Sequence, residues 1–145
     1  MGCILRVVRR VGCVVVGGAS VFALVACGGS SSSASVSLPP AGAPAAVVLD
    51  TYLRALVAGD CDAAHALAAS TFSVGNGELC GEVEVSAFSA PTGPARSGRH
   101  VVEYASDLTT AGSSDGSIAP GQTTWFYRLE RQGGEWRLAS GGSGP

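Results

Sequence analysis

After residue 60, two cysteines and two histidines have spacings that suit metal ligands. Cys61 and His65 are four positions apart, which places both side chains on one face of a helix, and Cys80 and His100 follow. Thiolates and imidazoles are common ligands of zinc. The chain has no Cys-x-x-Cys pair, however, and two cysteines also suit a disulfide bond. Whether these cysteines bind a metal or form a disulfide depends on the compartment in which the protein folds.

Two carboxylates, Glu82 and Glu84, share one face of an expected strand with Phe88, and a pair of carboxylates is the machinery of glycosidases. We favour a solvated acidic edge, because such charged positions commonly face water. No order of Ser, His and Asp suggests a catalytic triad. The sequence therefore assigns no catalytic residue.

Aromatic residues form the third group with chemical potential. Tyr hydroxyls and the Trp indole can supply the few polar contacts that orient a ligand in an apolar pocket. The same side chains also suit a plain hydrophobic core, and we favour this reading. The candidate pocket residues are Tyr52, Phe72, Tyr104, Trp125 and Tyr127.

Two helices are expected to position Tyr52 and Cys61. Residues 45–58 place their apolar side chains at helical spacing, and Gly59 is a stop signal. Asp60 is then a good N-cap for a second helix over residues 61–70. So short a connection predicts a helical hairpin. The apolar stripe of the first helix consists of Ala45, Val48, Leu49, Tyr52, Leu53 and Leu56.

Four later segments alternate apolar and polar residues, which predicts an antiparallel sheet with one face in water. Gly133-Gly134 suits a tight hairpin between the last two strands, and residues 109–122 read as a longer, mobile connection. Helices followed by about four strands predict an α+β fold with the helices on one face of the sheet. The apolar positions are Val83, Val85 and Ala87, then Val102, Tyr104 and Leu108, then Trp125, Tyr127 and Leu129, and finally Trp136 and Leu138.

The beginning of the chain has the layout of a secretory signal. Arg6, Arg9 and Arg10 form a basic start, and residues 11–26 carry no charge. This apolar run is shorter than the roughly 20 residues that a membrane-spanning helix needs. We therefore expect residues 1–26 to be a signal peptide.

The motif Leu24-Val25-Ala26-Cys27 resembles the lipobox of bacterial lipoproteins. The resemblance implies that Cys27 is linked to diacylglycerol and becomes the first residue of the mature protein. Each buried methylene of an acyl chain contributes about 0.8 kcal/mol, so two or three chains would hold a domain at a membrane. The expected location is the outer face of the bacterial cell membrane.

Removal of the signal peptide changes the charge and the cysteine count. The six remaining arginines and eleven acids give the mature chain a net charge of −5, which excludes a basic nucleic-acid binder. Cys61 and Cys80 are left as a pair in an oxidising compartment, which predicts a disulfide worth about 3 kcal/mol. We then expect no metal and no cofactor. Residues 27–44, rich in Gly, Ser and Pro, are expected to be a flexible tether, and residues 45–145 a single domain.

The run from Tyr52 through Arg54, Gly59 and Asp60 to Asp62 resembles the opening of the nuclear transport factor 2-like superfamily, whose first helix ends in a similar Ala-Gly-Asp-x-Asp pattern. The closing Gly134-Glu-Trp-Arg-Leu138 is similar to the last strand of those domains. The resemblance spans about residues 45–143. It implies two helices against a strongly bent antiparallel sheet, which together enclose a cone with an apolar pocket.

Ketosteroid isomerase belongs to this superfamily and offers a test for catalysis. The resemblance places Tyr52 at the position of its helix-one tyrosine, whose hydroxyl stabilises a dienolate. An ungapped extension places Asn76 at the position of its aspartate base, and an amide has no accessible basic form. Glu78 is the nearest carboxylate, but it lies in a loop that aligns poorly.

We therefore expect a membrane-anchored, extracytoplasmic lipoprotein without enzymatic activity, which binds a small apolar ligand or an envelope protein. The alternative is an isomerase-like or cyclase-like enzyme that uses Tyr52 in an apolar pocket. A third interpretation is a homodimer formed through the outer face of the sheet.

Overall fold

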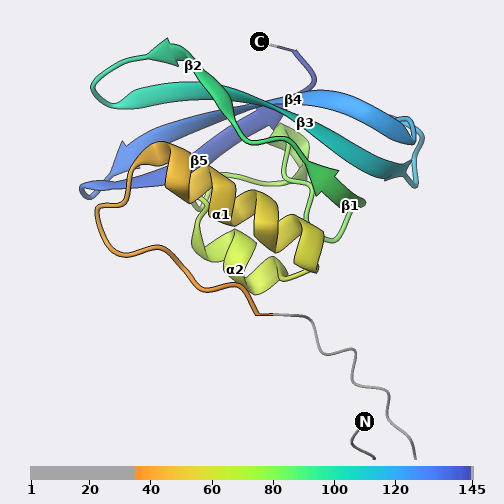
Figure 1. The fold of residues 1–145 in the computed structure, drawn as a ribbon, viewed down its shortest axis with the longest axis horizontal. Coiled ribbons are helices and arrows are strands. Elements are labelled where there is room, and N and C mark those ends of the chain that lie inside the picture. The colour runs from red at the N-terminus through yellow and green to blue at the C-terminus, as the bar shows by residue number, and fades with distance from the viewer. Residues whose placement is uncertain (1–34, 145) are drawn as a thin grey trace, which may run out of the picture. The chain divides into compact units, whose positions relative to one another are not determined.

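The computed structural model describes residues 35–144, so the expected signal peptide and Cys27 lie outside the described part of the chain. Two helices pack on one face of an antiparallel sheet, which confirms the α+β prediction (Figure 1). Within the described range, no helix is long and apolar enough to cross a membrane. The elements in chain order are α1 (Ala45–Ala58), α2 (Cys61–Ala66), the short 3-10 helix η1 (Val74–Asn76), β1 (Val83–Phe88), β2 (Thr92–Ser97), β3 (Val101–Ser113), β4 (Gly121–Gln132) and β5 (Glu135–Gly142).

The sheet has five strands instead of about four. Its order is β1-β3-β4-β5, and β2 pairs with the same strand, β3, as β1 does. β1 pairs with residues 108–113 and β2 with residues 102–105, so the two follow one another along one edge of β3. The sequence TGPARS of β2 contains Gly and Pro and does not alternate, which is why the apolar pattern missed it.

Helix α1 follows the prediction closely. All six residues of its apolar stripe are buried, and Gly59 ends it in the left-handed conformation, with φ of 66°. The side chain of Asp60 then accepts a hydrogen bond from the Ala63 N–H, as expected of an N-cap. The Ala-Gly-Asp turn therefore forms the predicted hairpin between α1 and α2.

Helix α2 ends at Ala66, four residues earlier than predicted. The backbone of Leu67 and Ala69 exchanges hydrogen bonds with Leu138 of β5, through Leu138 N–H to the Leu67 carbonyl and Ala69 N–H to the Leu138 carbonyl. The Arg137 guanidinium also donates to the Ala66 carbonyl at the end of the helix. Pairing with β5 replaces the last helical turn, which the helical pattern of the segment could not reveal.

The predicted connection over residues 109–122 is also too long. Strand β3 continues to Ser113, and β4 begins at Gly121. Thr110 is buried although it is polar, because its hydroxyl donates to the Ala119 carbonyl and accepts from the Gly112 N–H. Backbone pairing needs no apolar side chains, so polarity alone did not mark the end of the strand.

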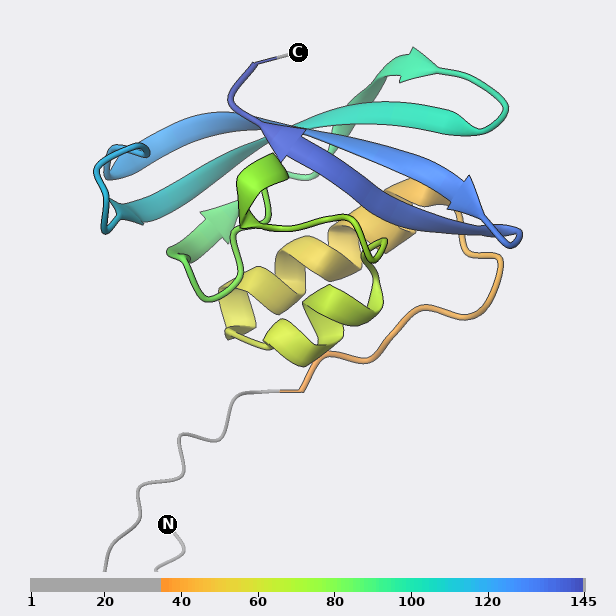
Figure 2. The ribbon, with the colours of Figure 1, turned by 180° about the vertical axis from the view of Figure 1, so that it is seen from behind.

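The end of the expected tether is packed on the domain. Residues 35–44, which we call the strap, run from beneath α2 up past the β4–β5 end of the sheet to the start of α1 (Figure 1, Figure 2), where residues 38–43 lie across a small pocket from residues 135–137. The Val36 N–H donates to the Asp60 carboxylate over 2.8 Å, and Ala43 is buried in the core. The flexible tether predicted for residues 27–44 is therefore wrong for the strap. Ala43 and Val36 are the apolar side chains that pack on the core, whereas Pro40, Ala41 and Pro44 stay exposed.

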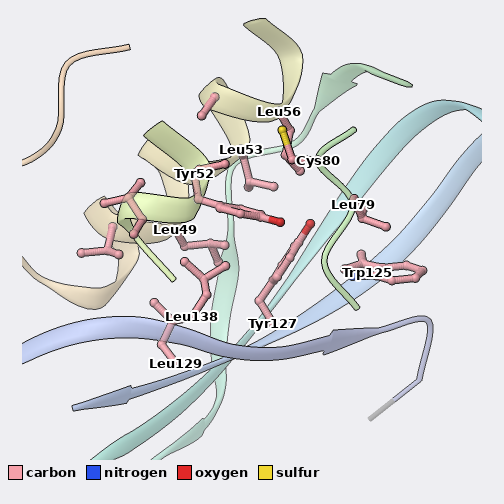
Figure 3. Close-up of a cluster of buried hydrophobic side chains, with 14 of the residues drawn as sticks. Leu49, Tyr52, Leu53, Leu56, Leu79, Cys80, Trp125, Tyr127, Leu129 and Leu138 are labelled. Carbon is pink, nitrogen blue, oxygen red and sulfur yellow. The ribbon is translucent and has the colours of Figure 1, made fainter. Parts of the chain in front are cut away.

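One hydrophobic core fills the space between the helices and the sheet (Figure 3). Leu49 of α1 faces Leu138 of the sheet, and Leu49, Leu53, Leu129 and Leu138 are all fully buried. The Cys61–Cys80 disulfide joins the start of α2 to the segment before β1, as predicted. This bond fixes the loop that carries η1 against the helical hairpin.

Candidate functional site

The five aromatic candidates are all buried, and three of them pack together in the core. The Tyr52 ring meets Phe72 and Tyr127 edge-on, at centroid distances of 6.0 and 5.6 Å. Tyr104 lies on the inner face of β3. Trp125, on β4, lies beside Leu79 at the edge of this group of side chains (Figure 3). These residues form a continuous core, and only Trp125 of the five lines the pocket described below.

The hydroxyl oxygens of Tyr52 and Tyr127 point toward one another at the centre of the core (Figure 3). Neither oxygen makes a well-formed hydrogen bond within residues 35–144, although the Leu79 backbone lies near enough to the Tyr52 hydroxyl to lower its pKa by less than burial raises it. Burial raises the pKa of the Tyr52 hydroxyl, and the negative charge of Glu78 raises it further. Burial also raises the pKa of Tyr127, with a smaller contribution from Tyr52. Both hydroxyls therefore remain protonated at neutral pH.

Glu78 is a buried carboxylate that was not among the candidate site residues predicted from the sequence. It follows η1 and is only 7 % exposed. Its Oε2 lies 3.1 Å from Nε2 of His65 on α2, while its Oε1 has no partner among residues 35–144. A signal for this contact was present: the disulfide brings Cys80 to Cys61, and His65 stands one helical turn beyond Cys61. A residue just before Cys80 can then reach His65.

The side chain of Asn76, which aligns with a catalytic base, forms hydrogen bonds that stabilise its own loop. Its Oδ1 accepts from the Ser73 N–H over 2.6 Å. Its Nδ2 donates to the Thr71 and Ala139 carbonyls. The amide is therefore a local structural element that tethers η1 to β5.

The pocket that we call the η1 pocket has a volume of about 590 Å³. It is lined by residues 74–79 with η1, by Glu82 and Val83 at the start of β1, by the turn 113–120 and residues 122–125 of β4, and by residues 141–143 at the end of β5. This volume is within the range of small-molecule sites. Trp125, 7 % exposed, forms part of its wall, and its Nε1 has no hydrogen-bond partner within the described chain.

Gly77 and Gly141 allow the close backbone packing that forms the wall beside Trp125. A Cβ on Gly141 would come within 2.7 Å of the Trp125 Nε1, and a Cβ on Gly77 would overlap the Gly141 carbonyl. Gly77 also has a φ of 100°, which L side chains rarely adopt. Close backbone contact between η1 and β5 thus shapes the pocket, and any side chain at these positions would force the two segments apart.

The charged residues that line the η1 pocket are all acidic: Glu78, Glu82 and Asp115. Asp115 accepts hydrogen bonds from the Ser113 hydroxyl and from the backbone and hydroxyl of Ser117, and these bonds lower its pKa to about 2. The turn 113–120 is therefore negatively charged at any pH near neutrality.

The alternative roles for the other polar residues find little support. Cys61 and Cys80 form a disulfide, so neither thiolate is free for zinc. His100 is exposed just before β3. Glu82 and Glu84 are both exposed, in keeping with a solvated acidic edge. Cys27, the expected lipid attachment site, lies outside the described residues.

The chain matches no family model, no curated protein and no solved structure. The geometry and charge of the site are therefore the basis on which a function is proposed.

Proposed function

We propose that this protein is a lipid-anchored, extracytoplasmic binding protein with a nuclear transport factor 2-like domain, and that the η1 pocket holds a small molecule. The lipobox residues and the basic, apolar N-terminal segment support the anchor. The Cys61–Cys80 disulfide fits an oxidising compartment. Two helices on one face of an antiparallel sheet are compatible with the cone-shaped fold implied by the resemblance.

The single observation that carries the binding function is the wall of the η1 pocket. Glu78 and Trp125 are each more than nine-tenths buried, and each has a polar atom without a partner within residues 35–144. Leaving such groups unpaired costs about 1–3 kcal/mol each. Both atoms are closed to solvent in this structure, so a ligand recovers part of this cost only when the wall of the pocket opens onto them.

The enzymatic alternative has one observation in its favour, the Glu78 charge near the Tyr52 hydroxyl. A catalytic hydroxyl must contact its substrate. Tyr52 is fully buried, with 0 % exposure, and it is not among the residues that line the η1 pocket. Binding without catalysis is therefore the function that we propose.

A bulky substitution in the lining of the η1 pocket tests whether ligands bind there. A fragment library with neutral, cationic and anionic members is screened by thermal shift against the full chain, against Ala119→Trp and against Ala95→Trp. Ala119 lines the η1 pocket, whereas Ala95 is an equally exposed residue of β2 outside it. We expect fragments that stabilise the full chain and Ala95→Trp but not Ala119→Trp. Fragments that stabilise all three equally, or none that stabilise any, would overturn the proposal.

The anchor is tested by metabolic labelling with palmitate in a bacterial host. The full chain should incorporate the label and Cys27→Ala should not. Equal labelling of both proteins, or of neither, would contradict lipidation at Cys27.

A further inference from the structure

We infer that a second site lies along the free edge of β1, where an extended, basic segment of a partner protein adds a strand to the sheet. This site is separate from the η1 pocket and does not depend on the function proposed for it. β1 is the end strand of the path β1-β3-β4-β5, and among residues 35–144 it pairs only with β3. An edge strand presents a row of backbone N–H and C=O groups to any further strand.

The backbone of β1 makes few hydrogen bonds beyond its pairing with β3. Within the described chain, the other backbone bonds run from the Glu82 and Val83 N–H groups to the Leu79 carbonyl, in the turn before the strand. Glu84 and Ser86, further along the strand, are exposed. The outward edge of β1 after Val83 is therefore open to a partner.

A groove, which we call the β1 groove, follows this edge. It has a volume of about 620 Å³ and is lined by residues 81–86, by residues 56–59 at the end of α1, and by the Cys61–Cys80 disulfide. The consecutive strand residues 83–86 all line it, although their side chains point alternately to the two faces of the sheet. A hollow over one face would be lined by alternate residues only, so the groove runs along the edge. Figure 1 shows β1 beside the end of α1.

The two sides of the β1 groove differ in polarity. Val83 and Val85, buried on the face toward the helices, line it together with Leu56 and the half-exposed Val57 of α1. Glu84 is exposed on the opposite face of the strand. Side chains of an added strand would alternate between these two surroundings. Apolar side chains therefore suit every second position of the partner, and polar ones the positions between.

The charges select the partner. The charged residues that line the β1 groove are both acidic, Glu82 and Glu84, and both are exposed. Opposite charges on neighbouring strands stabilise a sheet, which favours Arg or Lys at the polar positions of the partner. A second copy of this chain is disfavoured, because two-fold pairing of β1 with β1 would bring four carboxylates into one interface. Addition of an extended peptide to a sheet edge is a common mode of recognition.

The probe is an acetylated, amidated peptide of about nine residues that alternates arginine and valine. One control peptide has glutamate in place of arginine. A second keeps the arginines but carries N-methyl groups on its inner backbone nitrogens, so it keeps the charge and cannot donate hydrogen bonds to an edge. Calorimetry with the full chain measures binding. We expect the unmodified basic peptide to bind at least about tenfold more tightly than either control, because each control loses several strand interactions.

Matched substitutions on α1 locate the site. Val57→Arg places a cation in the β1 groove and should weaken binding of the basic peptide about tenfold, as expected for a like charge at about 6 Å in a partly solvated site. Val47→Arg is the control, since Val47 is 44 % exposed, Val57 is 42 % exposed, and only Val57 lines the groove. It should leave binding within about twofold. Both positions are exposed on one helix, so both variants should fold.

Amide hydrogen exchange shows whether a strand is added. The basic peptide should slow exchange within Val83–Phe88 of the full chain, and equally in Ala119→Trp, whose substitution lies in the η1 pocket. Failure of the small-molecule function would therefore leave this result unchanged. Unchanged exchange in β1, equal binding of the N-methylated peptide, or equal weakening by Val47→Arg and Val57→Arg would overturn the inference. A dimer of the free chain that protects β1 and excludes the peptide would assign the edge to a second copy, and would also overturn it.

Discussion

Two tyrosine hydroxyls lie at the centre of the core, and the one on Tyr127 has a measurable consequence for stability. Tyr127 is fully buried, and its oxygen makes no hydrogen bond within the described chain. Tyr127→Phe removes a desolvated polar group and keeps the ring, so the free energy of unfolding should stay constant or rise by up to about 1 kcal/mol. Urea denaturation measures this change.

Thr110→Val is the control for Tyr127→Phe. The Thr110 hydroxyl is also buried, but it is hydrogen-bonded to Ala119 and Gly112. Its removal leaves the Gly112 N–H and the Ala119 carbonyl unpaired and should lower the free energy of unfolding by about 1–2 kcal/mol. If Tyr127→Phe is as destabilising as Thr110→Val, the tyrosine hydroxyl has a partner after all.

The same hydroxyls predict how stability depends on pH. Burial raises the pKa of Tyr52 and of Tyr127 above the value of about 10 for an unfolded chain. A raised folded-state pKa gives stability that is complete below pH 10 and is lost as the pH rises toward the folded-state value. We expect the urea midpoint to fall above pH 10, and to fall less steeply in Tyr52→Phe/Tyr127→Phe. Identical slopes would show that these tyrosines do not titrate on unfolding.

At the scale of the elements, the contact between η1 and β5 leaves little space for added side-chain atoms. Gly77→Ala combines an unfavourable positive φ with overlap of the Gly141 carbonyl, so it should cost at least about 2 kcal/mol of unfolding free energy. Gly75→Ala, within η1 and two residues before Gly77, has only Ser73 Oγ within 4.0 Å and should stay within about 0.5 kcal/mol of the original. Thermal denaturation compares the two. Equal losses would mean that the η1–β5 approach is looser than described.

The elements also differ in how far they could be predicted from sequence. Helix α1 was predicted residue by residue, because burial on one face leaves a 3.6-residue period. β2 and the end of β3 were missed, since their pairing depends on backbone hydrogen bonds and leaves no alternation. The short α2 was overextended, because its end is set by Leu138, more than seventy residues away.

The candidate site was predicted less well than the fold. The five aromatic residues were correctly placed on inner positions, but position on an inner face does not distinguish core from pocket. Glu78 was discounted because it lies in a loop, and its burial follows from tertiary contacts with α2 that no local pattern records. The pocket itself is formed by turns and glycine backbone, and no sequence pattern indicates that these segments lie close together in the fold.

At the scale of the whole molecule, Asp60 joins the hairpin to the strap. One carboxylate oxygen accepts from Ala63 and the other from Val36, and these two backbone bonds lower the pKa of Asp60. A lowered pKa gives stability that is present above the unfolded value near 3.9 and is lost as the pH falls through the folded-state value. The attachment of the strap should therefore weaken in acid.

Substitutions at Asp60 separate its two roles. An amide keeps one acceptor oxygen but replaces the other with a donor, so Asp60→Asn can serve one N–H and not both. We expect Asp60→Asn to speed proteolysis within the strap while the domain stays folded, and Asp60→Ala to destabilise α2 as well. Limited proteolysis combined with circular dichroism distinguishes the two variants. An unchanged cleavage rate in Asp60→Asn would show that the Val36 contact does not hold the strap.

The strap also sets how far a lipidated protein could travel from its attachment point. From Cys27 to Val36 the chain can extend at most about 30 Å, whereas with the strap released to Pro44 it could extend about 60 Å. The accessible volume scales with the cube of this radius. In a chain attached at Cys27, the packed strap, held by Ala43 in the core and by the Val36–Asp60 bond, would therefore confine the domain to about one eighth of the space. Confinement of this kind raises the effective concentration of the domain toward anything else held at the same surface.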